Sequence, residues 1–215
     1  MDKDKTIVWL IVLVAILIAF NQYQIYGLTK GSATTGTSSG ITTTAAGIDV
    51  TPKGTPSIYG SELGVSYDGI SASNPQLANS IIKKIGDLDN SITLQGDNLK
   101  RYISIVSQIS CEYCCGAKSI IFSDGKAACG CAHSYAMRGL AKYLITKHSS
   151  EYTDDQVLEE LGKWKVLFFP GIHAQKAAVL QQKGIELNYI NLASNKYRDI
   201  EKGAAPSGGS MVGGC

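Results

Sequence analysis

The sequence predicts a mainly helical protein with an N-terminal transmembrane helix, a flexible stalk and a small helical bundle around a cysteine-rich loop. Residues 6–20 form an apolar run without a charge, and residues 31–56 are rich in glycine, serine, threonine and alanine. From Asn74 onward, apolar residues recur at helical spacing on both sides of five closely spaced cysteines. A chain of 215 residues is long enough for one ordinary domain with an appendage.

The N-terminal segment is expected to span the plasma membrane once. A spanning helix needs roughly 20 apolar residues, so we place the span at residues 6–28 and leave residues 1–5 in the cytoplasm. Two lysines precede the span, and only Lys30 follows it closely. Because positive residues stay on the cytoplasmic side, the C-terminal domain should be extracytoplasmic.

A cleaved signal peptide is the alternative, since its apolar region has about 7–15 residues. No small-x-small cleavage site follows the apolar run, and no cysteine follows it as in a lipoprotein signal. The pattern therefore favours an uncleaved signal anchor.

Three further regions follow the span. Residues 29–58 are expected to be a flexible linker, because their composition offers too little apolar surface to offset the entropy of ordering. Residues 59–203 should form the helical domain, with its Cys/His loop at 111–133. Residues 204–215 are rich in glycine and serine and should form a flexible tail.

Helix start signals divide the domain. Asn74-Pro75 predicts an N-cap followed by proline at the first helical position, and Gly86 is the expected end of that helix. A second helix should begin at Asp97 or Asn98 and lead directly into the cysteine loop.

A third helix is expected from His133 to about Lys147, with a buried stripe formed by Met137, Leu140, Ala141 and Leu144. Thr153 and Gln156 have the spacing of a capping box, which starts a fourth helix. Pro170-Gly171 should end that helix.

The C-terminal part of the domain is less regular. Residues 174–183 look helical, and residues 185–190 alternate partly like a strand. In an alternative interpretation, residues 166–169 are themselves a strand, which would make this end a small βαβ or α/β element.

The loop at 111–133 carries the candidate chemistry. Five of the six cysteines lie in these 23 residues, together with one of three histidines: Cys111, Cys114, Cys115, Cys129, Cys131 and His133. Thiolate is a preferred ligand of Zn²⁺, Cu(I) and iron–sulfur clusters, and imidazole suits zinc and copper. We therefore expect a metal ion here, zinc first, then Cu(I), then an iron–sulfur cluster.

A tetrahedral site needs four ligands, and six candidates are present. Cys114 and Cys115 are adjacent, so one of them should point away from a single ion. The first expectation is a site made of Cys111, Cys114, Cys131 and His133, which leaves Cys115 and Cys129 spare. A cluster of two ions that uses all six residues is the alternative.

Two other classes of function remain open, so the sequence does not decide whether the chain is an enzyme. Cys111 and Cys114 form a Cys-x-x-Cys at the end of a helix-forming stretch, the layout of a reactive dithiol. A redox enzyme would use this pair as its catalytic residues. A disulfide-stapled interaction module would instead join the two halves of the loop through disulfides, which the extracytoplasmic location permits.

The net charge and the sixth cysteine, Cys215, indicate which binding partners to expect. The net charge is +2 and no basic stripe occurs, so a nucleic-acid partner is not expected. The membrane is the expected partner, with a second membrane or redox protein as a further candidate. Cys215 could be a free thiol, an intermolecular disulfide or an additional metal ligand.

Four features follow one another in the chain: the Cys-x-x-Cys, a short linker, Met137-Arg138, and Thr-Asp-Asp-Gln-Val-Leu-Glu-Glu-Leu at 153–161. This order resembles the helical-hairpin thiol-oxidoreductase domain of cytochrome c maturation proteins. The order of motifs is also similar to that of extracytoplasmic lipoproteins with a Cys-Tyr-Cys-Gly-Cys-Gly motif. The resemblance covers residues 99–170 and implies a helical hairpin around a cysteine loop and a thiol–disulfide activity. Four residues have no counterpart in the oxidoreductase pattern: Cys115, Cys129, Cys131 and His133.

Overall fold

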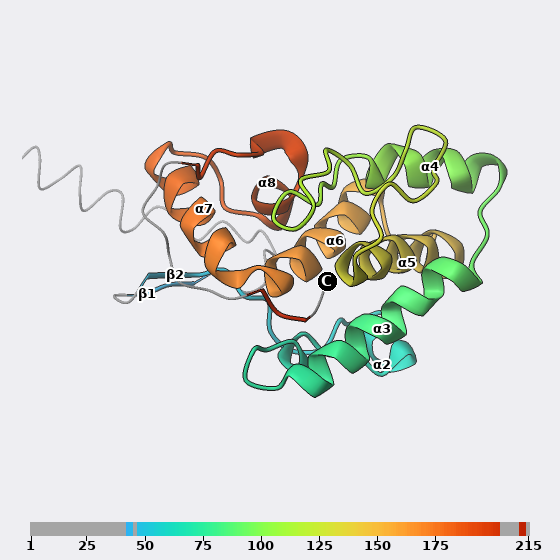
Figure 1. Ribbon diagram of the computed structural model, residues 1–215, viewed down its shortest axis with the longest axis horizontal. Coiled ribbons are helices and arrows are strands. Elements are labelled where there is room, and N and C mark those ends of the chain that lie inside the picture. The colour runs from blue at the N-terminus through green and yellow to red at the C-terminus, as the bar shows by residue number, and fades with distance from the viewer. Residues whose placement is uncertain (1–41, 45–46, 203–210, 214–215) are drawn as a thin grey trace, which may run out of the picture. The chain divides into compact units, whose positions relative to one another are not determined.

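The protein is mainly helical in the computed structural model, which describes residues 42–44, 47–202 and 211–213 (Figure 1). All of them belong to one compact unit, Ser38–Cys215. Its helices are α2 (Gly60–Leu63), α3 (Pro75–Ser91), α4 (Gly96–Val106), α5 (Ala132–Lys147), α6 (Asp154–Phe168), α7 (Pro170–Gln182) and α8 (Tyr189–Ala193). Two short 3₁₀ helices add to these, η1 (Tyr67–Gly69) and η2 (Asn195–Tyr197).

The N-terminal segments expected at residues 1–5 and 6–28 lie outside the described residues. Among the helices that are described, none has both the length and the apolar character needed to cross a membrane. Two strands, β1 (Thr42–Thr44) and β2 (Gly47–Asp49), pair antiparallel with Thr43 opposite Ile48. They fall within the interval expected to be a linker. Val50 in the same interval is buried and belongs to a small apolar cluster that includes Val166 and Leu180.

Helices α3 and α5 pack closely together, and glycine makes this contact feasible. A Cβ at Gly139 would lie 2.2 Å from the carbonyl oxygen of Ile85, so no larger residue fits without a shift of one helix. Gly86 does not end its helix as expected. It faces Tyr135 of α5 inside a helix that continues to Ser91, because packing against α5 outweighs the low helix propensity of glycine.

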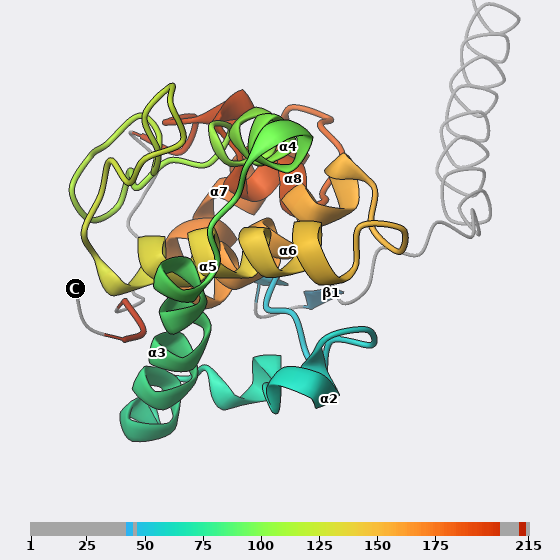
Figure 2. The same ribbon diagram turned by 90° about the vertical axis from the view of Figure 1, so that its right-hand side faces the viewer.

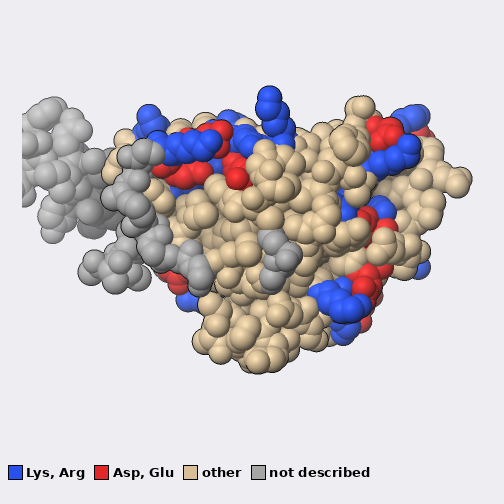
Figure 3. Space-filling model, in the orientation of Figure 1, with Lys and Arg blue, Asp and Glu red and all other residues tan. Residues whose placement is uncertain are grey.

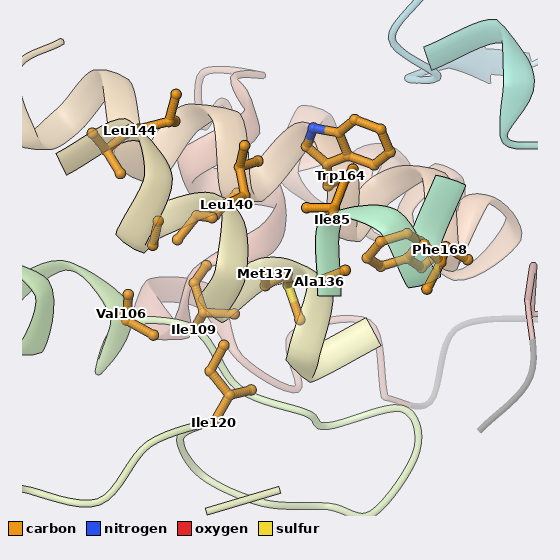
Figure 4. Close-up of a cluster of buried hydrophobic side chains, with 14 of the residues drawn as sticks. Ile85, Val106, Ile109, Ile120, Ala136, Met137, Leu140, Leu144, Trp164 and Phe168 are labelled. Carbon is orange, nitrogen blue, oxygen red and sulfur yellow. The ribbon is translucent and has the colours of Figure 1, made fainter. Parts of the chain in front are cut away.

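The main core lies between α3, α5 and α6 and reaches the cysteine loop (Figure 4). The predicted stripe of the third helix is buried in full: Met137, Leu140, Ala141 and Leu144. Ile109 and Ile120 extend the core into the segment that carries the cysteines. The loop is therefore attached to the core through its own apolar side chains.

Most predicted helix starts are confirmed. Asn74 caps α3 through the backbone N–H of Leu77, and Thr153 and Gln156 form the expected capping box at α6. Residues 166–168 belong to α6, and α7 begins at Pro170, four residues earlier than expected. The alternative βαβ element is thus not formed, and the segment expected as a strand at 185–190 leads into α8.

Candidate metal centre

The cysteine loop joins α4 to α5 through two tight turns. In the first turn, Cys111 pairs with Ala117, and the N–H of Cys111 donates to the Ala117 carbonyl at 3.1 Å. In the second, Ile121 pairs with Ala127. The first turn positions Cys114 and Cys115, and the second returns the chain so that Cys129 and Cys131 face the first.

The five cysteines of the loop form two overlapping groups. In each group the Sγ atoms lie within 4.8 Å of one another: Cys111, Cys114 and Cys131 in the first, and Cys111, Cys115 and Cys129 in the second. The Sγ atoms of Cys111 and Cys131 are 3.5 Å apart, and those of Cys115 and Cys129 are 3.1 Å apart. No disulfide joins any two of these five residues. The cluster could therefore hold a metal ion through sulfur ligands.

Cys131 occupies the N-cap of α5, and this position favours its thiolate. Its Sγ accepts a hydrogen bond from the N–H of Ser134 at 3.4 Å and lies 3.2 Å from the Ser134 hydroxyl. The hydrogen bond from Cys111 lowers the pKa of the Cys131 thiol, and the contacts with Ser134 lower it further against the effect of burial. The same hydrogen bond, together with burial, raises the pKa of Cys111 to about 12.

His133 does not belong to either group. Its Nε2 lies 2.7 Å from the carbonyl oxygen of Val212, and its ring packs against Phe168 and Phe169 with centroid distances of 4.5 and 5.2 Å. The side chain is fully buried, and burial lowers its pKa. The structure therefore unites five of the six expected ligands and places the sixth at a C-terminal segment, where neutral imidazole donates to a backbone carbonyl.

A buried ion pair joins the Cys-x-x-Cys segment to α6. The Glu112 carboxylate contacts the Lys165 ammonium at 2.8 Å, and both side chains are 1% exposed. Lys165 also donates to the Ser110 hydroxyl at 3.3 Å and to the Ala193 carbonyl at 2.8 Å. Burial lowers the pKa of Lys165 to about 8, although the Glu112 charge opposes this. The segment is thereby tied to α6 and α8.

Two arginines hold the turns of the loop. Arg198 donates to the carbonyl groups of Ala117 and Gly116, each at 3.1 Å, and so supports the first turn. Arg138 is buried on α5, where it pairs with Asp89 at 2.7 Å and donates to the Cys129 carbonyl at 2.8 Å. The cysteines are therefore presented by a loop whose backbone is fixed from both sides.

Sequence reasoning missed these supporting residues. Lys165 lies in the apolar stretch of the fourth helix, and a charge at such a position was the one available signal of a buried partner. Glu112 and Arg198 gave no signal of their own, because their pairing joins segments far apart in the chain. On the face shown in Figure 3, lysine and arginine side chains lie beside acidic ones, and no cationic stripe is visible there.

A comparison with protein-family models finds no match for this chain. Comparisons with curated proteins and with solved structures also find no match. The cysteine cluster is therefore the basis for inferring a function.

Proposed function

We propose that the protein is a membrane-anchored, extracytoplasmic metal-binding protein that holds a soft metal ion at the cysteine cluster. The observation that carries this proposal is the convergence of three sulfur atoms, those of Cys111, Cys114 and Cys131, within 4.8 Å. Zinc is the first candidate, followed by Cu(I) and an iron–sulfur cluster, since all three accept thiolate ligands.

Preorganisation supports binding at this place. The guanidinium groups of Arg138 and Arg198 donate to backbone carbonyls of the turns that present the sulfur atoms, and the buried Glu112–Lys165 pair also holds these turns. Outer contacts of this kind orient metal ligands and typically change metal affinity by about 10- to 100-fold. The positive charge of Lys165 also acts on Cys111, which would offset part of the negative charge of a thiolate–metal centre.

The location is part of the same proposal. An apolar run at residues 6–20, preceded by two lysines, supports an anchor with the domain outside the cytoplasm. A thiol cluster in that location would be protected from oxidation by a bound ion, because metal-bound thiolates are occupied as ligands.

Metal content of the purified full-length chain tests the proposal. The protein would be isolated in detergent without chelator, and its metals counted by inductively coupled plasma mass spectrometry. We expect about one ion of a soft metal per chain, and a strong reduction in a Cys111→Ser variant, because Cys111 belongs to both groups. A content below about 0.2 ion per chain in the unmutated protein would contradict metal binding.

A second candidate function is thiol–disulfide exchange, which two short sulfur–sulfur distances favour. The pairs Cys111–Cys131 and Cys115–Cys129, at 3.5 and 3.1 Å, are close enough to close disulfides with a small movement. The sequence assigns this exchange to Cys111 and Cys114, and we propose Cys131 in place of Cys114 because its Sγ lies 3.5 Å from that of Cys111. The Cys131 thiolate attacks a partner's disulfide and releases one partner thiolate. Cys111 then attacks the mixed disulfide, so that the partner leaves with two thiols and the Cys111–Cys131 bond is formed.

The redox account makes its own prediction. Cys111→Ser should accumulate mixed disulfides with partner proteins, visible on non-reducing gels, because the resolving thiol is missing. A Cys115→Ser variant is the control, because it keeps both thiols of the Cys111–Cys131 pair and should not accumulate these adducts. If the same two pairs are instead permanent staples, their reduction potential should lie below about −300 mV.

A further inference from the structure

The cysteine cluster contains more sulfur ligands than the proposed ion uses. That ion is bound by Cys111, Cys114 and Cys131. The remaining loop cysteines, Cys115 and Cys129, form a second group of three with Cys111. Each group combines two buried cysteines with one exposed cysteine, and in the part of the chain that the structure describes neither has a fourth candidate ligand. The loop therefore offers two sets of three sulfur atoms that share one member.

The order of the cysteines in the chain fits two ions better than one. Cys114 and Cys115 are neighbours, yet each belongs to a different group. Cys129 and Cys131, at the other end of the loop, are divided between the two groups in the same way. Each group thus takes one member of each pair, and Cys111 completes both groups. A single ion would leave one cysteine of each pair unused, whereas two ions use all of them.

Cys111, the shared member, is buried and has a fixed backbone. Its N–H donates to the Ala117 carbonyl at 3.1 Å, and its own carbonyl accepts from the N–H of Gly116 at 2.9 Å. Figure 2 shows the loop in yellow-green at one end of the domain, with its last residues leading into α5. A thiolate sulfur has more than one lone pair, so it can bind two ions at once. Cys111 is therefore placed to bridge the two groups.

A group of three sulfur atoms suits Cu(I) better than the other candidate metals. Zinc in structural sites is almost always bound by four ligands, so water would have to complete its coordination in either group. Iron–sulfur clusters are typically held by four cysteines. Cu(I) is selected by soft thiolate ligands and is stable with only three of them. The number of ligands in each group therefore favours Cu(I).

The sulfur–sulfur distances are close to those that such an ion requires. A three-coordinate ion with metal–sulfur bonds of about 2.3 Å, as for zinc, holds its sulfur atoms about 4.0 Å apart. The Sγ atoms of Cys111 and Cys131 are 3.5 Å apart, and those of Cys115 and Cys129 are 3.1 Å apart. The first pair must separate by about 0.5 Å and the second by about 0.9 Å. Cys115 is exposed, so its side chain can rotate without disturbing the core.

We propose that the five loop cysteines form a two-ion Cu(I) centre with Cys111 as the bridging thiolate. One ion is bound by Cys111, Cys114 and Cys131. The other is bound by Cys111, Cys115 and Cys129. This inference rests on the proposed metal-binding function and specifies the metal and the number of ions. Each thiol that becomes a ligand releases its proton, and copper enters and stays as Cu(I), so no electron is transferred.

The two groups should fill in order. In the first group, the N–H of Ser134 donates to the Sγ of Cys131 at 3.4 Å, which favours a thiolate there before any metal arrives. The second group lacks such a printed backbone donor on Cys115 or Cys129 and needs the larger separation of its sulfur atoms. Purified protein should therefore hold one ion, and the second ion should enter when Cu(I) is supplied.

Titration with Cu(I) tests the two-ion centre. Full-length protein in detergent would be reduced, kept anaerobic and titrated with Cu(I) against a Cu(I) chelator, and copper per chain would be counted after removal of unbound metal. We expect two Cu(I) ions per chain at saturation. X-ray absorption of the loaded protein should show copper bound to sulfur together with copper–copper scattering, which indicates a bridged pair.

Four variants assign the ligands. Cys114→Ser and Cys115→Ser should each retain one ion and lose the copper–copper scattering, and because both positions are exposed the fold should be kept. Cys111→Ser should weaken the binding of both ions, since both groups contain this residue. Ser123→Ala, at an exposed position of the second turn, is the control and should still bind two ions. Circular dichroism of each metal-free variant would check that the helices are intact.

The outcomes separate the two-ion centre from metal binding in general. Reduced, unmutated protein that binds neither Cu(I) nor Zn²⁺ would overturn the metal-binding function and this inference with it. Saturation at one Cu(I) per chain would overturn only the two-ion centre. Two ions without copper–copper scattering would overturn the bridging role of Cys111. Loss of an ion in a Cys215→Ser variant would overturn the ligand set of five loop cysteines.

Discussion

Glu112 and Lys165 form an ion pair of 2.8 Å in which each side chain is only 1% exposed. Glu112 lies inside the Cys-x-x-Cys, and Lys165 lies on α6. Two charges removed from water are tolerated only when they are paired and hydrogen-bonded. The position of the first two cysteines is therefore coupled to the packing of a helix more than 50 residues further along the chain.

Replacing Glu112 with glutamine should destabilise the protein strongly, because the Lys165 ammonium would remain buried without its counter-charge. Removal of one partner of a buried pair typically costs about 3–5 kcal/mol. Urea unfolding of the metal-free protein would measure the change. Asp97→Asn is the matched control, since its pair with Lys100 is largely exposed and should contribute less than about 1 kcal/mol. Equal midpoints for the two variants would contradict the structural role of Glu112.

Metal affinity should rise with pH. The hydrogen bond to Cys131 and burial raise the pKa of Cys111 to about 12, so this thiol carries its proton near neutral pH and a metal ion must displace it. Each displaced proton changes the apparent affinity about tenfold per pH unit, with weaker binding as the pH falls. Competition titrations with a chelator between about pH 6 and pH 8 would measure the slope. A pH-independent affinity, after correction for the chelator, would show that Cys111 is not a ligand.

Arg198→Ala should weaken metal binding more than it weakens the fold. Its guanidinium holds the carbonyl groups of Gly116 and Ala117 at the first turn, but its side chain is 22% exposed. Loss of an outer contact of this kind predicts a decrease in zinc affinity of about 10- to 100-fold. Chelator competition would measure it, with Lys196→Ala, an exposed neighbour, as the control. If both variants bind zinc equally, the turn does not depend on Arg198.

Gly139→Ala tests the close packing of α3 on α5. The added methyl group would meet the Ile85 carbonyl oxygen at 2.2 Å, so the helices would have to separate. Overpacking of this kind typically costs about 1–3 kcal/mol. Thermal unfolding would show a lower midpoint for Gly139→Ala than for Gly130→Ala, where no atom lies within 4 Å of the added Cβ. A higher unfolding midpoint for Gly139→Ala than for Gly130→Ala would contradict the close contact between α3 and α5.

Local signals in the sequence were enough to predict most helix starts. The Asn74-Pro75 start and the Thr153–Gln156 capping box depend on residues within one turn of each other, and both are present in the structure. The end of α3 and the start of α8 were misjudged, because Gly86 and residues 185–190 take their conformation from packing against α5 and α6. Periodicity carries no information about such contacts.

The cysteines of the candidate site can be predicted from the sequence, but most of the residues that support them cannot. Spacing alone grouped Cys111, Cys114 and Cys131, which the structure brings together. His133, the expected fourth ligand, closes the same run of residues, but its Nε2 contacts the carbonyl of Val212, which lies 79 residues away in the chain. Long-range partners of this kind, such as Arg198, are fixed by tertiary packing and leave no pattern in the sequence. Among the supporting residues, Lys165 alone shows a signal, a charge within the apolar stretch of the fourth helix.

The proposed function depends on a metal ion held at the cysteine cluster. Native mass spectrometry of the full-length protein, followed by thiol counting after denaturation, measures whether this ion is present. We expect a metal adduct that disappears on denaturation and loop cysteines that then react as thiols. No adduct, with Cys111–Cys131 and Cys115–Cys129 recovered as disulfides, would contradict it.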